Sequence, residues 1–359
     1  MHLNSIKKRR ADPPFFRGIV LMIMNIKYSF IPMLFFITIF VCLVVFAQQN
    51  DREAGIKAFN ARDYSQAVQL LRKATKNVGS DAEAWYYLGA AYLGTDKNKE
   101  AIKALDKASS LNPTNDLYLS GLGYAYMRNF DGRAGEISDK ALEINPKNPQ
   151  AHYVIGVVAY RRASYSIAYE RAKRAIDLKP DYAAAYLLKS ESLVSSYSIQ
   201  SGAVQRDPKS KYDLLTEATT DLEKYVSLIP DGKERQRQTE YLSSLRFFSE
   251  YYKRPENHKA TSIDPVTPDP NETNVKIISK PKATYTDAAR MNGVSGTIRL
   301  LIELASDGKV RNILVIKRLG SGLDEQALDA ARDIKFTPAT KNGVPISVVK
   351  TFEYSFMIY

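Results

Sequence analysis

Histidine and cysteine, the side chains that most often act as bases, nucleophiles and metal ligands, are rare and scattered in this chain. The three histidines are His2, His152 and His258, and the only cysteine is Cys42. General-base and nucleophilic catalysis need two such groups within hydrogen-bond reach of each other. The sequence also lacks a Gly-rich phosphate-binding loop and a paired acid site. We therefore expect a protein that is not an enzyme, with no catalytic residues, no cofactor and no metal site.

Aromatic and apolar side chains recur instead at positions that a helical repeat would turn toward one groove. These positions are Tyr86, Leu93, Tyr124, Met127, Tyr153, Val157 and Tyr160. Such a groove suits an apolar or peptide-like ligand, because tyrosine rings give rigid amphipathic contacts. The alternative is that several of these tyrosines pack between helices, which is the commoner role of aromatic residues at helical spacing.

Small residues recur every 33 or 34 positions and define the repeat that would form this groove. They are Gly55, Gly89, Gly123 and Gly156, then Ala67, Ala101, Ala134 and Ala168, with Pro113, Pro146 and Pro180 closing the units. Gly and Ala let the two helices of a unit approach, and each unit buries its apolar face against its neighbours. This pattern resembles the tetratricopeptide (TPR) repeat, and it implies a helical solenoid over residues 48–252.

The fifth unit is 16 residues longer than the others, because Ala168 and Pro180 find their counterparts 50 residues later, at Ala218 and Pro230. We place the extra residues near 194–213, between the two helices of the unit. Insertions in solenoids form loops on one face, so this one is either a contact surface or a tolerated surface loop. The amphipathic stretch after Pro230 predicts a terminal capping helix.

An apolar run without charge spans residues 28–47 and follows residues 1–27, which form either a cytoplasmic segment or an over-extended start. At about 1.5 Å of helix rise per residue the run can cross about 30 Å of hydrocarbon. Val45 and Ala47 occupy the places that a signal peptidase reads, so cleavage after Ala47 is the alternative. Both interpretations export the rest of the chain. Since Cys42 lies in this run, the exported part has no thiol for disulfides or metal binding.

The formal charge of +12 does not indicate nucleic-acid binding. Residues 1–27 contribute +5 of it, and residues 276–359 contribute another +5. The long middle of the chain is close to neutral, and no block of like charge marks a surface that would follow a phosphate backbone. We therefore expect no nucleic-acid partner.

The last part of the chain predicts a small α+β unit after a Pro-containing linker over residues 253–274. Residues 296–304 and 310–317 read as two strands joined by a turn, and residues 323–334 as a helix that Ser321 or Asp324 caps. In the first strand Ile298, Leu300, Ile302 and Leu304 share one face, with Thr297, Arg299 and Glu303 opposite. A last strand follows, in which Phe352, Tyr354, Phe356 and Ile358 alternate with polar residues. The sheet of this unit leaves a strand edge available.

Residues 275–359 resemble the C-terminal domain of TonB, the energy transducer of the bacterial envelope. The opening "KPKATYTDAARMNGVSGTIRLLIEL" is similar to the opening of that domain. The match continues through Gly322, Leu323, Asp324, Ala327, Phe336, Pro338, Ala339 and Gly343. We therefore expect a mostly α protein in which a TPR solenoid precedes a small α+β TonB-like domain.

The resemblance implies that this domain binds an extended segment of an outer-membrane TonB-dependent receptor, or of another envelope protein, by strand addition. Carried over by position, the partner-binding strand comprises Lys350, Thr351, Phe352, Glu353, Tyr354, Ser355 and Phe356. The TPR array then serves as spacer and partner platform. The expected location is the bacterial cell envelope, facing the periplasm, with the chain either anchored in the inner membrane or released after Ala47.

Two features separate this chain from a typical TonB transducer. Its proline-containing spacer is short, and residues 28–47 contain no histidine and no charged residue for contact with an inner-membrane motor complex. Intramembrane ionisable groups are the usual means of coupling force to protons. Two functions stay open: a transducer or adaptor that binds receptor segments, and a soluble periplasmic scaffold without energy transduction.

Overall fold

A computed structural model describes residues 51–200, 211–254 and 271–358. The predicted leader at 28–47, its cleavage site and residues 1–27 lie outside this part of the chain, as do most of the predicted linker and the middle of the predicted insertion. The chain divides into two compact units, one ending at Pro113 and one beginning at Thr114. We describe each unit by itself.

The first unit consists of helical repeats. Residues 51–60 are helical, and they precede α2 (Tyr64–Asn77), α3 (Ala82–Gly94) and α4 (Asn98–Leu111). Asp81 precedes α3 and accepts a hydrogen bond from the Ala84 N–H at 3.0 Å, which satisfies one free donor of the first turn. A Cβ on Gly89 would lie 2.4 Å from Leu105 Cγ. The repeated glycine is therefore a packing requirement where α3 crosses α4.

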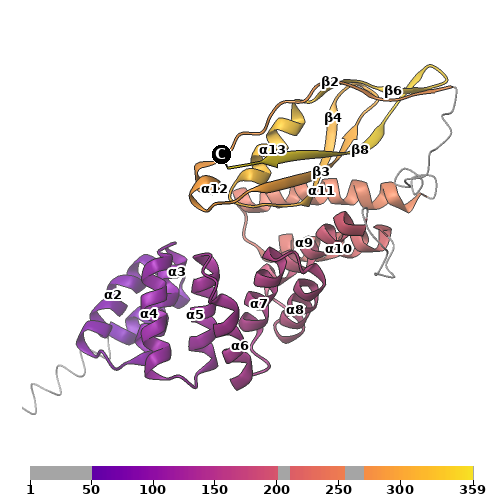
Figure 1. The fold of residues 1–359 in the computed structure, drawn as a ribbon. Coiled ribbons are helices and arrows are strands. Elements are labelled where there is room, and N and C mark those ends of the chain that lie inside the picture. Colours follow the sequence, from indigo (N-terminus) through magenta and orange to yellow (C-terminus); the bar gives the residue numbers. More distant parts are fainter. Residues whose placement is uncertain (1–50, 201–210, 255–270, 359) are drawn as a thin grey trace, which may run out of the picture. The chain divides into compact units, whose positions relative to one another are not determined.

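The second unit continues the repeats in a run of antiparallel helices (Figure 1). They are α5 (Asp116–Arg128), α6 (Ala134–Ile144), α7 (Pro149–Arg161), α8 (Tyr165–Leu178), α9 (Ala183–Gln200), α10 (Lys211–Leu228) and α11 (Lys233–Lys253). The close crossings recur here, since a Cβ on Gly123 would lie 2.3 Å from Ser138 Oγ and one on Gly156 would lie 2.9 Å from Leu188 Cδ2. The predicted capping helix after Pro230 corresponds to α11.

The predicted insertion is largely helical where the structure describes it. Helix α9 continues to Gln200, and α10 begins at Lys211. The reason is apolar burial: Val194 and Tyr197, which sequence reasoning placed in a loop, are 1% and 2% exposed. They join a core with residues of α10 and α11. A longer fifth unit therefore provides two longer helices.

A charged cluster fixes α9 against α10. The Lys189 Nζ lies 3.0 Å from Glu217 Oε1 and 2.9 Å from Asp221 Oδ2. The Tyr169 hydroxyl of α8 donates to the same Glu217 oxygen at 2.8 Å. Because these groups are mostly buried and mutually paired, we assign them a structural role.

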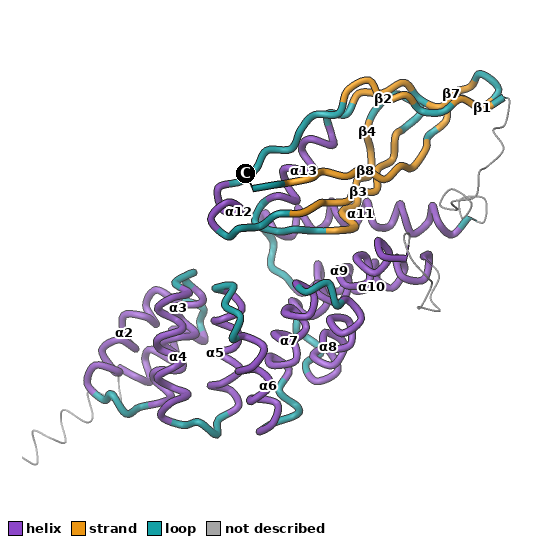
Figure 2. The backbone as a smooth tube through the Cα atoms, in the orientation of Figure 1, coloured by secondary structure: helices purple, strands orange, loops and turns teal. Residues whose placement is uncertain are grey.

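The C-terminal domain follows α11 and combines short strands with two helices. The strands are β1 (Glu272–Thr273), β2 (Lys276–Ser279), β3 (Gly296–Leu304), β4 (Val310–Lys317), β5 (Lys335–Thr337), β6 (Ala339–Lys341), β7 (Val344–Ile346) and β8 (Val348–Phe356), and the helices are α12 (Asp287–Met291) and α13 (Leu323–Arg332). The central sheet has the order β4-β3-β8, while β2-β5 and β1-β6-β7 form smaller ladders. Figure 2 shows the strands of the central sheet beside α11.

The central sheet is antiparallel and regular along β8. Nine residues of β3 pair with β8, from Gly296 opposite Phe356 to Leu304 opposite Val348. One face of this sheet is covered by α13, whose Leu323, Ala327 and Ala331 are fully buried with Ile298, Leu300, Ile302 and Leu304 of β3. The predicted order of strand, strand, helix and strand is thus found in β3, β4, α13 and β8.

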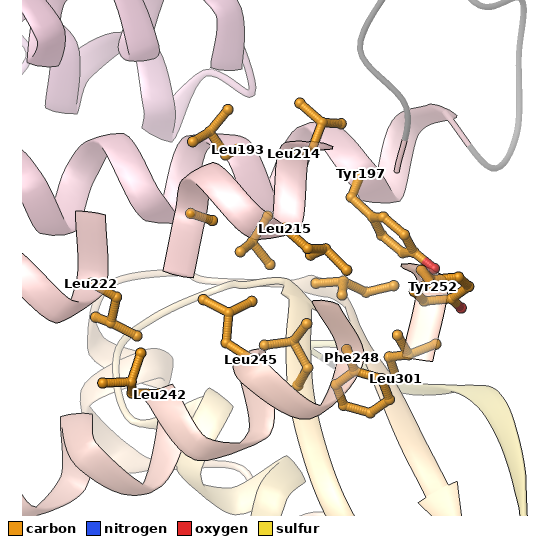
Figure 3. Packing of buried hydrophobic residues seen from close by; sticks show 14 of the residues in the cluster. Leu193, Tyr197, Leu214, Leu215, Leu222, Leu242, Leu245, Phe248, Tyr252 and Leu301 are labelled. Atoms are coloured by element: carbon orange, nitrogen blue, oxygen red, sulfur yellow. The ribbon is translucent and has the colours of Figure 1, made fainter. Parts of the chain in front are cut away.

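The opposite face of the sheet packs against the solenoid. Leu301, Leu314 and Ile316 belong to the same buried cluster as Leu245 and Phe248 of α11. Figure 3 shows Leu301 beside Phe248, and the same cluster includes Leu214, Leu215 and Leu222 of α10. The second unit therefore has one core shared between its last repeats and its C-terminal domain.

Two local expectations were wrong. Neither Ser321 nor Asp324 caps α13, because the preceding residue is Gly322 with φ of +79°, and no side chain bonds the first turn. Ile358 lies beyond β8 and is 53% exposed, since the strand ends at Phe356. Within the predicted linker, Glu272 and Thr273 form β1, which pairs with β6.

Candidate functional site

The free edge of β8 is the first candidate surface. Among the residues that the structure describes, β8 has one strand neighbour, β3, and so it ends the central sheet. Phe352 is half-buried, and Tyr354 and Phe356 are buried, on the α13 side, while Thr351, Glu353 and Ser355 on the other face are exposed. The seven residues predicted as the partner-binding strand thus lie together on this edge.

The direction of the edge groups follows from one contact. The Lys280 Nζ donates to the Glu353 carbonyl oxygen at 2.5 Å, so this carbonyl points away from β3. In an antiparallel strand the N–H and C=O of one residue point to the same side, and alternate residues share that side. Thr351, Glu353 and Ser355 therefore direct their backbone groups to the free edge.

Lysine and arginine side chains border this edge. The Lys280 Nζ also lies 4.5 Å from the ring centre of Tyr354. On the face of the sheet away from α13, Arg299 Nε pairs with Glu353 Oε1 at 2.6 Å. A lysine lying across an edge strand is a common protection against unwanted pairing.

A row of tyrosine rings on the repeats of the second unit is the second candidate surface. The rings of Tyr124 and Tyr153 are 6.3 Å apart, and those of Tyr153 and Tyr182 are 5.1 Å apart. They form a row from α5 across α7 to the residue that precedes α9. Burial raises the pKa values of Tyr153 and Tyr160 above the usual range for a phenol. Tyr124 and Tyr153 are two of the residues predicted to line the groove, whereas Tyr182 was not among them.

The C-terminal domain lies directly over part of this groove. A cavity of about 680 Å³ has walls from both parts of the second unit. Tyr153, Val157 and Tyr160 contribute from α7, while Val294, Leu319 and the loop between β4 and α13 contribute from the C-terminal domain. These three predicted groove residues therefore face the protein's own domain.

The remaining predicted groove residues are distributed differently. Met127 is only 4% exposed, so its side chain is part of the helix packing. Its carbonyl oxygen accepts a hydrogen bond from Arg161 Nη1 at 2.9 Å. Tyr86 and Leu93 lie on α3 in the first unit, where both are half-buried. The groove prediction therefore includes one core residue and two residues of a separate unit.

Sequence reasoning missed a charged cluster where the domain meets the solenoid. Arg318, just after β4, has its Nε 3.5 Å from Glu191 Oε1 and its Nη1 3.6 Å from Asp324 Oδ2. Its guanidinium carbon lies 5.0 Å from the ring centre of Tyr241 on α11. Burial raises the pKa of Glu191. The partners come from segments far apart in sequence, so no local pattern marks them.

Metal-ligating side chains do not gather in the parts of the chain that the structure describes. Within residues 51–200, 211–254 and 271–358, no three His, Cys, Asp or Glu side chains form a metal-binding group. His152 contacts the Pro146 carbonyl oxygen through Nε2 at 2.9 Å and Arg171 through Nδ1 at 3.2 Å. It is buried in the repeat, and burial lowers its pKa. In the same residues no helix is long and apolar enough to cross a membrane.

Comparison with known proteins supports both modules. Residues 281–358 match the family described as the Gram-negative bacterial TonB protein C-terminal domain. Residues 52–116 match the tetratricopeptide repeat family. The chain joins TPR repeats to a TonB-like domain. Both modules are interaction domains, and the TPR part indicates a scaffold for protein interactions.

Solved structures resemble the TPR part. A thermophilic TPR protein of Thermus thermophilus is 19% identical, with a TM-score of 0.44, and the match covers 56% of this chain and 99% of the other. A MamA protein is also 19% identical, with a TM-score of 0.39 and coverage of 52% and 97%. YrrB, a TPR protein with an unusual peptide-binding site, is 18% identical, with a TM-score of 0.35 and coverage of 53% and 90%.

A curated relative matches one short region. Anaphase-promoting complex subunit 3 of Schizosaccharomyces pombe is 29% identical over 92 residues, which are 25% of this chain. The match spans only 14% of the length of that relative.

Proposed function

We propose that this protein is an adaptor of the bacterial cell envelope. In this proposal it faces the periplasm and captures extended segments of outer-membrane receptors, or of other envelope proteins, by adding them as a strand to β8. The observation that carries the proposal is the free edge of β8 in a domain that matches the TonB C-terminal family. The TPR repeats serve as spacer and as platform for further partners.

The edge supplies affinity through its backbone. Thr351, Glu353 and Ser355 each present one N–H and one C=O, and each hydrogen bond formed contributes a net stabilisation of about 0.5 to 1.5 kcal/mol. Side chains then discriminate between partners, because an added strand places alternate residues beside Phe352 and Tyr354 on one face and beside Glu353 on the other. A segment with alternating apolar and polar residues fits both faces.

The experiment that tests strand addition removes one outward donor. Thr351→Pro deletes an edge N–H but leaves the β3–β8 ladder intact, since proline is tolerated where the N–H faces outward on an edge strand. We expect Thr351→Pro to lose capture of receptor segments in a pull-down from outer-membrane extracts. Thr351→Val, which keeps the N–H, is the matched control and should still bind. Undiminished capture by Thr351→Pro would contradict the proposal.

A soluble periplasmic scaffold without energy transduction is the second candidate. Two observations favour it: residues 28–47 contain no charged residue, and the sheet shares a core with α11, so the domain is held to the solenoid by more than its linker. The N-terminal sequence of the protein from fractionated envelope distinguishes the two. A start at Gln48 in the soluble fraction supports the scaffold, whereas an intact leader in the inner membrane supports an anchored transducer.

A further inference from the structure

The solenoid contacts the side chain of Arg318, which belongs to the C-terminal domain, through Glu191 and Tyr241. Arg318 and Glu191 have side chains only 22% and 21% exposed, and they meet at the junction between α9 and the loop after β4. The ring of Tyr241 lies to one side of the guanidinium, with its centre 5.0 Å from the guanidinium carbon. The Tyr241 hydroxyl donates to the Val315 carbonyl oxygen at 3.4 Å, just before Arg318. The setting therefore combines a carboxylate, an aromatic ring and low solvent access.

These are the groups that recognise a guanidinium. A carboxylate satisfies its charge and hydrogen-bond donors, and an aromatic ring attracts it through the cation–π interaction. Arginine is also more weakly hydrated than lysine, so its burial beside such groups costs less. The solenoid supplies both elements from different helices, Glu191 from α9 and Tyr241 from α11. Neither belongs to the small residues that define the TPR packing pattern.

The C-terminal domain prepares Arg318 for this site. Asp324 Oδ1 accepts hydrogen bonds from the Leu319 N–H at 3.0 Å and the Gly320 N–H at 3.4 Å, which fixes the loop behind Arg318. Its other oxygen lies 3.6 Å from Arg318 Nη1. The guanidinium is thus held at Nε by the solenoid and at Nη1 by its own domain. A lysine ammonium is a single point charge and cannot span these two contacts.

We propose that helices α9 and α11 of the solenoid carry a recognition site for an arginine side chain, formed by Glu191 and Tyr241, and that Arg318 of the same chain is its occupant. The occupied site holds the TonB-like domain over the tyrosine row, so the domain itself is the ligand of this end of the groove. A partner that enters the groove at Tyr153 and Tyr160 must displace it. This inference is independent of strand addition at β8.

A second ion pair between the same two parts provides the matched control. Arg237 Nη1 on α11 lies 3.6 Å from Glu325 Oε1 on α13, at nearly the same distance as the Arg318 contacts. Both of these side chains are more than half exposed. Exposed pairs are screened by water and salt and contribute little. Arg237→Met therefore removes an equivalent charge without removing the proposed recognition.

The test measures docking of the domain directly. The protein is used at full length with Cys42→Ser, and spin labels are attached to cysteines that replace the exposed residues Lys173 in the solenoid and Met291 in the C-terminal domain. Double electron–electron resonance then measures the distance between the two labels. We expect one narrow distance for this background and for Arg237→Met. Arg318→Met should raise the ratio of undocked to docked protein by about tenfold, because Glu191 of a mostly buried pair loses its charged partner. Arg318→Lys should raise the same ratio, because a lysine ammonium keeps the charge but cannot span both contacts. Glu191→Gln should do the same from the solenoid side.

Chemical rescue separates recognition from simple loss of packing. In Arg318→Ala, added guanidinium ion should restore the narrow distance, whereas methylammonium at the same concentration should not. Circular dichroism checks that each variant keeps its helices. An unchanged ratio of undocked to docked protein in Arg318→Met, or an equal effect of Arg237→Met, would overturn the proposal. A narrow distance that depends on protein concentration would also overturn it, because the site would then take Arg318 from a second copy.

Discussion

The core shared by the sheet and the solenoid leads to a prediction about cooperativity. Leu300 and Leu301 are neighbours in β3, at 0% and 3% exposure, but they face opposite sides of the sheet. Leu300 packs with α13 in the core of the C-terminal domain. Leu301 packs with Leu245 and Phe248 of α11. The same substitution at the two positions therefore perturbs two different interfaces.

The expected cost can be estimated from burial. Replacing a fully buried leucine by alanine removes transfer free energy and leaves a cavity, at about 2 to 5 kcal/mol. The free-energy cost of Leu300→Ala should fall within this range, because the sheet and α13, between which Leu300 packs, belong to one domain. Leu301→Ala should cost about 2 to 4 kcal/mol, at the lower side of that range, because α11 can move toward the sheet and reduce the cavity. The two free energies are similar, so stability alone does not separate the variants.

Amide hydrogen exchange separates them, because it reports local opening. Leu301→Ala should lower protection in both α11 and β3, since the helix loses its contact with the sheet. Leu300→Ala should lower protection in β3 and α13 and leave α11 close to the wild-type level. Urea unfolding followed by circular dichroism supplies the total free energy for both. If Leu301→Ala left protection of α11 unchanged while destabilising β3, the shared core would be refuted.

Two further predictions concern single positions. Gly89→Ala should destabilise the first unit by about 1 to 3 kcal/mol through overpacking, because its Cβ would lie 2.4 Å from Leu105 Cγ; Gly79→Ala, which meets nothing within 4 Å, should leave the thermal midpoint unchanged. Burial raises the pKa of Tyr354 to about 12, whereas an unfolded tyrosine ionises near pH 10. The folded state is thus favoured below pH 10 and loses this stability as pH rises toward 12. Tyr354→Phe should unfold at higher pH in an alkaline titration, and an unaltered midpoint would show that this hydroxyl does not titrate with folding.

The repeat and the order of the C-terminal elements could be predicted because they depend on local patterns. Gly89, Gly123 and Gly156 recur at helix crossings, where a side chain would meet the neighbouring helix. The alternation of apolar and polar residues likewise predicted β3 and β8, because successive side chains of a strand point to opposite faces of the sheet. The strands that sequence reasoning missed, such as β5 to β7, have three residues each and bury few side chains.

The docking of the domain on α11 was missed although the sequence contained a signal for it. The segment Leu300-Leu301-Ile302 has three apolar residues in succession, and β4 has Leu314-Val315-Ile316. Such runs are typical of strands buried on both faces. The alternation of apolar and polar residues alone predicts burial only for the face of β3 that carries Leu300. The identity of the covering element could not be predicted, since Glu191, Tyr241 and Arg318 meet only in the folded chain.

Amide exchange by NMR tests most directly whether β8 binds an added strand through its outward backbone groups. With a receptor-derived extended peptide bound, the amides of Thr351, Glu353 and Ser355 should become protected. Those of Phe352 and Tyr354, which already face β3, should change little. Binding that leaves the three outward amides unprotected would contradict strand addition at β8.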